Sequence, residues 1–274
     1  MLLEQVSAVE DPRLADYRDL READHRRRGL FVAEGRLAVR QLLRSPRFTT
    51  RSVLTTEPML EGLTDLLALA PEPPPVLLAS HALIRQVVGF TFHRGCLAMG
   101  ERGAPSSVAP LIEPAGPRLI LVLEALVDPE NVGAVFRNAL AFGADAVLVS
   151  PGCGDPLARK AIRVSSGGTL RVPFALIEPW PEGLAQLNAT GYQIAALAAD
   201  GAENLQAIGR SRPVPPRLAL LLGNEGHGLS TAVRAFASVT VRIAMAPGVD
   251  SLNVATAGGI ALHHVRQMEG NQPR

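Results

Sequence analysis

The sequence has a single lysine, Lys160, only two cysteines, and few aromatic residues, which make up 4% of its 274 positions. The cysteines, Cys96 and Cys153, lie far apart without a CxxC partner, so we expect a reduced cytoplasmic protein without a structural zinc site. The scarcity of aromatic side chains argues against a binding face built from stacked rings. No apolar run approaches the roughly 18 residues of a membrane helix. Because the first residues include the acids Glu4 and Glu10 and lack a long apolar stretch, we expect that they are not a signal peptide.

Two phosphate-binding signatures are also missing. No GxGxxG follows a predicted strand, and no GxxxxGK[ST] occurs in the chain. Both signatures place backbone N–H groups of a glycine-rich loop around phosphate oxygens. Their absence removes the main support for a nicotinamide enzyme or another nucleotide-dependent enzyme of the doubly wound type.

Charge is balanced overall but unevenly placed. Lys and Arg number 27 against 26 Asp and Glu, a formal net charge of +1, and all the basic residues except Lys160 are arginine. A GC-rich genome by itself favours arginine codons, so only the placement of the arginines is informative. Residues 18–51 hold ten arginines and four acids, a local charge of +6 that leaves −5 for the remainder. Within this stretch Arg26, Arg27 and Arg28 predict a loop that contacts phosphate, although a solvated helix edge has the same pattern.

Proline-rich segments divide the chain. Residues 71–75 are followed at once by apolar residues and are interpreted as a loop inside a domain, whereas residues 103–117 hold four prolines without an apolar period. We therefore predict domains at residues 1–103 and 118–274, joined by a linker at 104–117. The first domain is expected to be a small α/β domain with a mixed sheet, with helices at 11–22, 35–43 and 57–70 and strands at 52–55, 76–79 and 96–99.

The second domain alternates strands and helices more regularly. Strands are predicted at 119–123, 146–149, 172–176, 193–197, 218–222 and 239–243, and helices at 132–142, 157–164, 182–187, 230–236 and 254–268. These strands are apolar without alternation, which is typical of a parallel sheet covered by helices on both faces. Because ligands bind such sheets beyond the carboxyl ends of the strands, the loops that follow the strands are the candidate site.

The first of these loops runs through Asp128-Pro129-Glu130-Asn131 into a helix that carries Arg137. We predict that Asn131 caps this helix by accepting a hydrogen bond from a free backbone N–H, and that Arg137 lies on the second turn. A capped helix with a surface arginine explains the same residues without any function.

The second loop, GNEGHGL at residues 223–229, follows the strand at 218–222. Its glycines imply positive φ angles or a close backbone approach. The carboxylate of Glu225 would repel a phosphate, so the loop suits a neutral or cationic ligand contacted through backbone groups. A glycine-rich turn with a solvated acid is the alternative.

The third loop ends in Ser251-Leu252-Asn253, directly before the final helix. Ser251 or Asn253 is expected to cap that helix. The helix contains Gly258 and Gly259, and each glycine costs roughly 1 kcal/mol of helix propensity. Such a cost predicts very close packing against another backbone.

Together these residues resemble a known family. The runs NVGAVFRNA (131–139), GNEGHGL (223–229) and SLNVATAGGIAL (251–262) are similar to the three motifs of the SpoU (TrmH) family of RNA 2′-O-ribose methyltransferases, which belongs to the SPOUT superfamily. Each run is short, but the three occur in the family's order and each follows a predicted strand. The stretch EGRLAVRQLL (34–43) resembles the L30e-like substrate-binding domain that many members carry.

The resemblance implies an α/β fold in which a C-terminal SPOUT domain has a parallel sheet and a deep trefoil knot, next to a smaller N-terminal L30e-like domain. It also implies a homodimer with active sites at the subunit interface. S-adenosylmethionine is expected in the knot, held mainly by backbone groups. By position, its contacts are expected at Gly223, Ile243 and Leu252, and further at Leu197, Ala198 and Pro247.

The polar positions of the family's motifs fall on Arg137, Asn131, Glu225, Ser251 and Asn253. Methyl transfer from a sulfonium is an in-line displacement that requires no metal. In the family the arginine of the first motif is proposed to activate the ribose hydroxyl. Because a guanidinium has a pKa above about 12, we expect Arg137 to stabilise the developing alkoxide, while the proton leaves to an RNA phosphate, water or Ser251. Glu225 and Asn131 are expected to hold the loops, and Asn253 or Ser251 to orient the hydroxyl.

The implied substrate is RNA, and the L30e-like domain favours rRNA of the 23S type over tRNA. Arg163 in the second domain is a further candidate RNA contact, beside Arg26, Arg27 and Arg28. The few aromatic residues favour recognition of RNA shape and backbone. The alternative is a non-catalytic RNA-binding protein that keeps the fold, but such a chain would be expected to lose Arg137, Asn131 or the GNEG loop.

Overall fold

The computed structural model describes residues 2–18, 20–69, 72–89, 95–113, 119–211 and 213–270, and its contacts divide the chain into two compact units. The first unit comprises Met1–Ala104 and Leu157–Arg171, and the second comprises Pro105–Pro156 and Val172–Arg274. Residues 157–171, which the sequence analysis assigns to the second domain, thus pack with the first unit. Residues 114–117 of the predicted linker lie outside the described residues, and the predicted domain boundaries stay a prediction.

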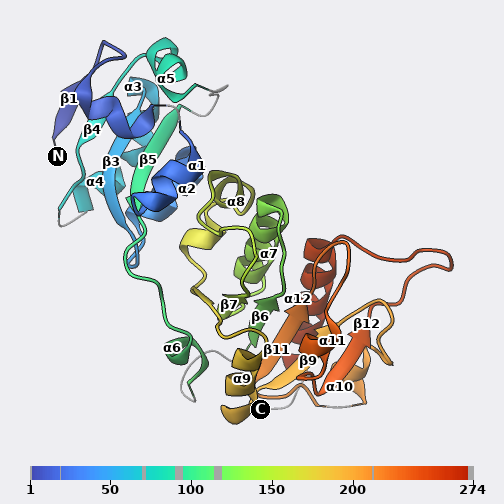
Figure 1. The fold of residues 1–274 in the computed structure, drawn as a ribbon. Coiled ribbons are helices and arrows are strands. Elements are labelled where there is room, and N and C mark those ends of the chain that lie inside the picture. The colour runs from blue at the N-terminus through green and yellow to red at the C-terminus, as the bar shows by residue number, and fades with distance from the viewer. Residues whose placement is uncertain are drawn as a thin grey trace. The chain divides into compact units, whose positions relative to one another are not determined.

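A mixed sheet of five strands forms the centre of the first unit, in the order β1-β4-β3-β5-β2 (Figure 1). Its strands are β1 (Leu3–Gln5), β2 (Leu30–Glu34), β3 (Thr49–Thr55), β4 (Val76–Leu78) and β5 (Cys96–Glu101). β4 pairs in parallel with β1 and β3, whereas β5 runs antiparallel to β2 and β3. The predicted mixed sheet is therefore confirmed, and the sequence analysis missed β1 and β2.

The helices of the first unit are short. They are η1 (Pro12–Tyr17), α1 (Glu22–Arg27), α2 (Arg36–Leu43), α3 (Glu57–Leu60), η2 (Glu61–Leu63), α4 (Thr64–Leu69), α5 (His81–Val88), α8 (Arg159–Val164) and η3 (Gly168–Leu170). The continuous helix expected at residues 11–22 is wrong. Asp11 caps a single 3-10 segment, and the backbone becomes extended at Arg18, with φ −76° and ψ 135°, so that α1 begins only at Glu22.

The second unit is built on a parallel sheet of seven strands, in the order β10-β12-β9-β11-β6-β7-β8. Its strands are β6 (Leu119–Leu123), β7 (Ala146–Val149), β8 (Phe174–Leu176), β9 (Gln193–Leu197), β10 (Glu203–Asn204), β11 (Leu218–Leu222) and β12 (Val239–Arg242). All the described pairings between these strands are parallel, which confirms the prediction from the apolar runs. The sequence analysis missed the two-residue strand β10.

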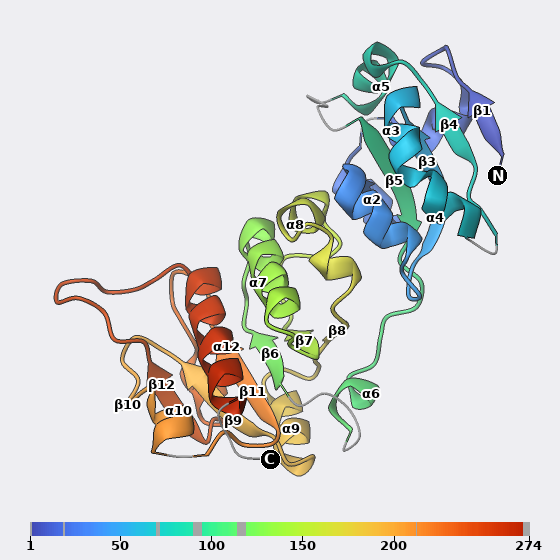
Figure 2. The same ribbon diagram turned by 180° about the vertical axis from the view of Figure 1, so that it is seen from behind.

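Helices cover both faces of this sheet. They are α6 (Ala109–Ile112), α7 (Pro129–Ala141), η4 (Glu182–Leu184), α9 (Ala185–Ala189), α10 (Ala207–Arg210), α11 (Thr231–Arg234) and α12 (Val254–Gly270). α7 and α12 lie side by side on one face of the sheet, the face turned toward the viewer in Figure 2. None of the described helices is both long and apolar enough to cross a membrane.

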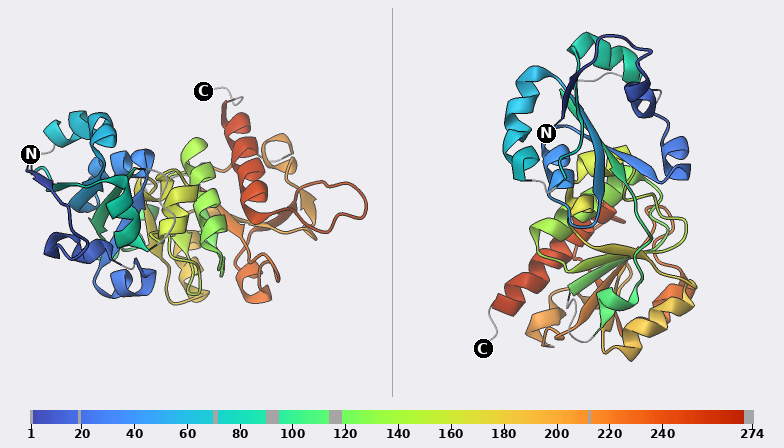
Figure 3. Two further views of the ribbon diagram at one scale, coloured as in Figure 1. Left: turned by 90° about the horizontal axis from the view of Figure 1, so that it is seen from above. Right: turned by 90° about the vertical axis from the view of Figure 1, so that its left-hand side faces the viewer.

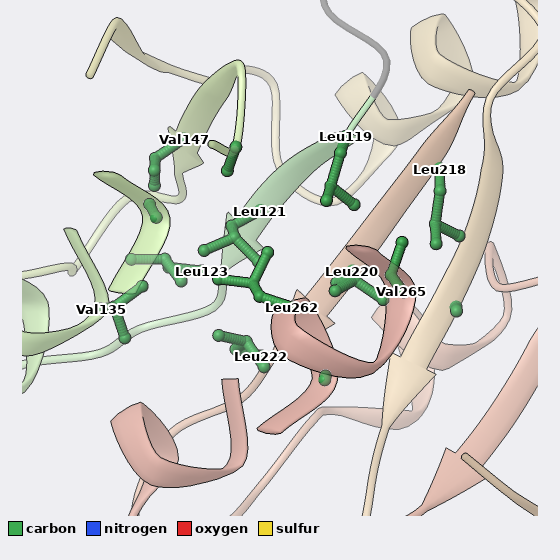
Figure 4. Close-up of a cluster of buried hydrophobic side chains, with 14 of the residues drawn as sticks. Leu119, Leu121, Leu123, Val135, Val147, Leu218, Leu220, Leu222, Leu262 and Val265 are labelled. Carbon is green, nitrogen blue, oxygen red and sulfur yellow. The ribbon is translucent and has the colours of Figure 1, made fainter. Parts of the chain in front are cut away.

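Alternate residues of the central strands enter two separate cores. In β6, Leu119, Leu121 and Leu123 pack with side chains of α7 and α12, including Val135 and Leu262 (Figure 4). The intervening β6 residues belong to a second buried cluster with side chains of η4, α9 and α11. Because both faces of β6, β7 and β11 are buried, the sequences of these central strands are apolar throughout.

The small residues of α12 allow it to lie very close to its neighbours. A Cβ on Gly258 would come within 2.9 Å of the Leu222 side chain, and one on Gly259 within 2.9 Å of the Asn138 amide. The amide of Asn138 donates to the carbonyl of Ala255 at 2.7 Å, which fixes α7 against α12. The helix therefore packs closely, but Gly258 and Gly259 face the side chains of Leu222 and Asn138 and not another backbone as predicted. The trefoil knot stays a prediction. Residues 243–253, between β12 and α12, form an extended loop (Figure 3).

Candidate active site

Three polar loops meet at one edge of the parallel sheet. They follow β6, β11 and β12, and because these strands run in parallel, their carboxyl ends lie at the same edge. Asn131 of the first loop is 94 residues from Glu225 of the second and 122 residues from Asn253 of the third, but the sheet order β12-β9-β11-β6 places the three strands near one another. This arrangement brings the three motifs of the sequence analysis together.

Asn131 is the point at which the three loops join. Its amide Nδ2 donates to Glu225 Oε1 at 2.7 Å, and its Oδ1 accepts from Asn253 Nδ2 at 2.9 Å. One side chain from each motif thus takes part in a continuous hydrogen-bonded chain, which we call the amide relay.

The cap predicted for Asn131 is wrong. α7 begins at Pro129, and Asp128 is its N-cap, accepting from the backbone N–H of Glu130 at 2.9 Å. Proline at the first helical position has no N–H to satisfy, and the helix starts at Pro129, three residues before the predicted start at residue 132. Asn131 then lies in the first turn with its side chain free for the relay, and Arg137 lies on the third turn.

Asn253, by contrast, both caps a helix and joins the relay. Its Oδ1 accepts from the backbone N–H groups of Ala255 at 3.0 Å and Thr256 at 3.2 Å. Of the two predicted caps of α12, it is Asn253 and not Ser251 that makes these bonds. Ser251 is exposed at the carboxyl edge of the sheet.

The GNEGHGL loop is a tight turn closed by Asn224. Asn224 and Gly228 exchange backbone hydrogen bonds at 3.1 and 2.9 Å, and the Asn224 side chain accepts from the N–H groups of Gly226 and His227. A Cβ on Gly223 would lie 2.3 Å from the carbonyl carbon of Gly228, so only glycine fits there. Gly228 has φ +66°, which also favours glycine. Both explanations offered for the glycines are therefore confirmed.

A buried carboxylate anchors the far end of this loop. Glu124 is 8% exposed, and its two oxygens accept from the backbone N–H and the hydroxyl of Ser230, at 2.8 and 2.7 Å. Ser230 is also the N-cap of α11. Ala125, which follows Glu124, has φ +46°, and its carbonyl oxygen accepts a hydrogen bond from Asn224 Nδ2 at 2.8 Å. The turn after β6 therefore holds both ends of the GNEGHGL loop.

A cavity of about 650 Å³ opens between the loops after β9, β11 and β12. Of the predicted cofactor contacts, five line it, and Pro247 does not. The five are Leu197, Ala198, Gly223, Ile243 and Leu252. Of the predicted catalytic residues, Glu225, Ser251 and Asn253 line it, whereas Asn131 and Arg137 do not.

The charged side chains of the cavity are mostly acidic. Its described lining holds the carboxylates of Asp200, Glu225 and Asp250 and one guanidinium, that of Arg234. Arg234 donates to Asp200 at 2.9 Å, and this bond lowers the pKa of the Asp200 carboxyl below its usual value. The cavity is therefore suited to a ligand with a net positive charge.

Arg137 is exposed on α7 and forms no hydrogen bond or ion pair with any residue that the structure describes. Its neighbour Asn138 lines a shallow hollow of about 520 Å³ between α7 and α12, on the outside of these helices. The structure thus brings Asn131, Glu225 and Asn253 together and leaves Arg137 outside that group.

The predicted RNA-binding arginines lie in the first unit. Arg27 pairs with Asp24 and Arg28 with Asp16, whereas Arg26 is exposed without an ion pair to a described residue. Arg163 is half-buried at the end of α8, in the segment that packs with the first unit. The prediction that it belongs to the catalytic domain differs from this packing.

Sequence reasoning missed four residues that shape the site: Asp128, Glu124, Asn224 and Ser230. Proline directly after Asp128 was a usable signal for the true start of α7. Serine directly before the short helix α11 was a usable signal for the cap at Ser230. Glu124 gave no local signal, because its partner lies 106 residues further along the chain.

Comparisons with known proteins agree with this geometry. Residues 118–263 match the SpoU rRNA Methylase family. A Mycobacterium tuberculosis protein named as an uncharacterized tRNA/rRNA methyltransferase is 40% identical over 271 residues, which cover 95% of this chain and 91% of the relative. The 23S rRNA (guanosine-2′-O-)-methyltransferase RlmB of Nitrosomonas europaea is 32% identical over 189 residues, 68% of this chain and 71% of the relative.

A solved structure shows the same fold. The AdoMet-bound rRNA methyltransferase from Sinorhizobium meliloti superposes with a TM-score of 0.79 at 24% identity, over 97% of this chain and 98% of that one. The family match spans more than half of the sequence, and the mycobacterial relative matches almost all of it. The chain therefore belongs to the SpoU rRNA Methylase family of S-adenosylmethionine-dependent RNA 2′-O-ribose methyltransferases.

Proposed function

We propose that the cavity binds S-adenosylmethionine and that the chain methylates a ribose 2′-hydroxyl of rRNA beside it. The amide relay of Glu225, Asn131 and Asn253 is the observation that carries this proposal. It joins one residue from each of three loops at the rim of the cavity. Apolar contacts would hold the loops together equally well, so the use of polar side chains from distant parts of the sequence indicates a function.

The cavity suits this cofactor in size and charge. Its volume of about 650 Å³ lies within the range of about 300–1,000 Å³ typical of small-molecule sites. Three carboxylates against one guanidinium match the net positive charge of S-adenosylmethionine, and Leu197, Ile243 and Leu252 provide apolar surface for its purine. When bound, the cofactor supplies an electrophilic methyl group on its sulfonium.

Arg137 is proposed to position the ribose or its phosphate and to stabilise the negative charge that develops on the 2′-oxygen. A guanidinium is a poor base because its pKa is above about 12, but it is a strong electrostatic partner for an oxyanion. Exposure without an ion pair among the described residues leaves its donors free for RNA. The proton of the hydroxyl then leaves to an RNA phosphate, water or Ser251.

The relay is proposed to hold the reacting geometry. Asn253 fixes the start of α12, Asn131 fixes the start of α7, and Glu225 accepts from Asn131 across the cavity rim. Ser251 and Asn253, both lining the cavity, orient the 2′-hydroxyl toward the methyl group. Proximity of this kind lowers a bimolecular barrier without any covalent step on the protein.

A homodimer is proposed, with a second copy packed on the outer face of α7 and α12. This face carries Ile260, which is 39% exposed, and the shallow hollow beside Asn138. Arg137 directly precedes Asn138 in α7 and does not line the cavity, which fits a site completed at a subunit interface. Sedimentation of the wild type and of Ile260→Arg tests the proposal, since a charge on this face is expected to yield monomers.

Ribosomal RNA of the 23S type is the proposed substrate, with tRNA as the alternative. The first unit, proposed to be an L30e-like RNA-binding domain, carries the arginine cluster at residues 18–51. The relative RlmB is named for 23S rRNA, whereas the mycobacterial relative is named for tRNA or rRNA. Arg26, Arg27, Arg28 and Arg163 are the proposed phosphate contacts.

The deciding experiment maps 2′-O-methylated nucleotides in rRNA and tRNA from a deletion strain, complemented with the wild type or with Arg137→Ala. One ribose methylation in 23S rRNA is expected to disappear on deletion and to return with the wild type only. Loss of a tRNA methylation instead would assign the alternative substrate. Unchanged methylation in both RNAs, with the purified protein still binding RNA, would favour the hypothesis of a non-catalytic RNA-binding protein.

A further inference from the structure

An ion pair on the cavity wall lies outside the three sequence motifs. Asp200 follows β9, Arg234 is the last residue of α11, and the two side chains are joined by the bond of 2.9 Å between Nη1 and Oδ2. Both residues line the cavity, with side-chain exposures of 69% for Asp200 and 33% for Arg234. An exposed pair of this kind contributes little to stability, so its position calls for another explanation.

The pair keeps binding capacity on both members. A guanidinium has five N–H donors, and a carboxylate has about four lone-pair sites, whereas the bond between them uses one of each. The Arg234 guanidinium holds the pKa of Asp200 below its usual value, so both groups are charged at neutral pH. A positive and a negative group therefore stand side by side, each able to accept one further partner of opposite charge.

Among the described lining residues, Arg234 is the one guanidinium. A carboxylate that enters the cavity beside Glu225 or Asp250 would be repelled by the negative charge of those side chains. The wall around Leu197, Ile243 and Leu252 is apolar and has no charge to offer. Among the described lining residues, the Asp200–Arg234 pair places a guanidinium that can bind an anion beside a carboxylate that can bind a cation.

We propose that Asp200 and Arg234 form the subsite for the α-amino acid end of the cofactor, Arg234 binding its carboxylate and Asp200 its ammonium group. The inference rests on the proposed binding of S-adenosylmethionine in this cavity. Ligand and protein charges then alternate around a ring of four, which satisfies every charge without burying any of them. The pair thus selects a complete cofactor or its product over nucleosides that share the adenine and ribose.

Calorimetry with three ligands tests this directly. S-adenosylhomocysteine carries both charged groups, its decarboxylated analogue carries only the amine, and 5′-methylthioadenosine carries neither. Arg234→Gln is expected to weaken the binding of S-adenosylhomocysteine by about tenfold or more, because a hydrogen bond between charged groups is lost. The affinity for 5′-methylthioadenosine is expected to stay within about twofold of the wild-type value. Asp200→Asn is expected to weaken the binding of S-adenosylhomocysteine and of its decarboxylated analogue to the same extent, because both carry the amine.

Arg210→Gln is the matched control, because Arg210 is an exposed arginine of the same unit that does not line the cavity. It is expected to bind all three ligands as the wild type does, and thermal melting of each variant checks that it is folded. Equal weakening of all three ligands by Arg234→Gln would show a merely structural pair and overturn the inference. Failure of the wild type to bind S-adenosylhomocysteine at all would instead overturn the proposed function.

Discussion

The two units use charged and polar side chains in opposite ways. In the first unit, arginines that look free in the sequence are paired: Arg27 with Asp24, Arg28 with Asp16, and Arg51 with both Asp16 and Glu101. In the second unit, polar residues far apart in sequence converge on a single relay, while Arg137 stays unpaired among the described residues. A local count of charges therefore overstates what a surface offers to RNA.

The ion pairs of the first unit and the amide relay of the second unit also differ in how much a disturbance costs in free energy. An exposed ion pair is worth about 0–1 kcal/mol and is screened by salt, so an RNA phosphate can displace the acid at little cost. The amide relay has donors and acceptors in fixed order, and reversing one of them leaves two acceptors face to face. We expect substitutions in the second unit to have large effects and those in the first unit to have small ones.

The largest effect is expected for Arg137→Ala. Loss of the charge that stabilises the 2′-oxyanion is expected to reduce kcat at least 100-fold, as removal of one oxyanion donor typically does. Methyl incorporation into RNA measures this loss, and calorimetry with S-adenosylhomocysteine is expected to give an affinity within about twofold of the wild type. A variant that keeps its activity would remove Arg137 from the proposed chemistry.

Gly223→Ala is expected to damage the cavity itself. The new Cβ would meet the Gly228 backbone at 2.3 Å, and backbone cannot move aside as a flexible side chain can. We expect a loss of about 1–3 kcal/mol in the free energy of unfolding and weaker cofactor binding. Gly226→Ala is the control for stability, because its Cβ meets only the Asn224 side chain at 3.4 Å. Equal melting temperatures for the two variants would contradict this account of the loop.

Asn131→Asp tests the order of donors in the relay. The aspartate has the shape of asparagine but presents an acceptor to Glu225, so two carboxylates would face each other across what is now a bond of 2.7 Å. We expect a loss of about tenfold in kcat/KM. Adding Glu225→Gln supplies a donor from the other side, and the double variant is expected to recover much of the activity. No recovery would mean that Asn131 acts other than by holding the loop.

Local sequence patterns predicted the middle of the parallel sheet well. β6, β7 and β11 are buried on both faces, so each of them is a continuous apolar run that can be recognised in the sequence. Such patterns failed where short segments depend on partners. β1 and β10 have three and two residues and exist because β4 and β12 offer a free edge. β2 was not predicted either, although the apolar run Leu30–Ala33 between Gly29 and Glu34-Gly35 is typical of a buried strand.

The residues of the candidate site could likewise be predicted in part. The family resemblance named Asn131, Glu225 and Asn253, and the structure joins them, but no spacing in the sequence shows that Asn131 bonds to both of the others. Asp200 and Arg234 gave no signal, because 34 residues and two strands separate them. Contacts of this kind are set by the order of strands in the sheet, which only the fold supplies.

The smallest effect is expected in the arginine cluster, where Arg26 and Arg27 form a matched pair of neighbours on α1. Arg26 has no ion pair among the described residues, whereas Arg27 is held by Asp24. Arg26→Gln is expected to weaken rRNA binding by a few fold and to lower the salt dependence by about 0.7–0.9 in the log–log slope, the loss of one phosphate contact. Arg27→Gln is expected to change both less, because its guanidinium must first leave Asp24. Titrations at several salt concentrations measure both quantities, and equal slopes for the two variants would show that the ion pair does not restrain Arg27 at all.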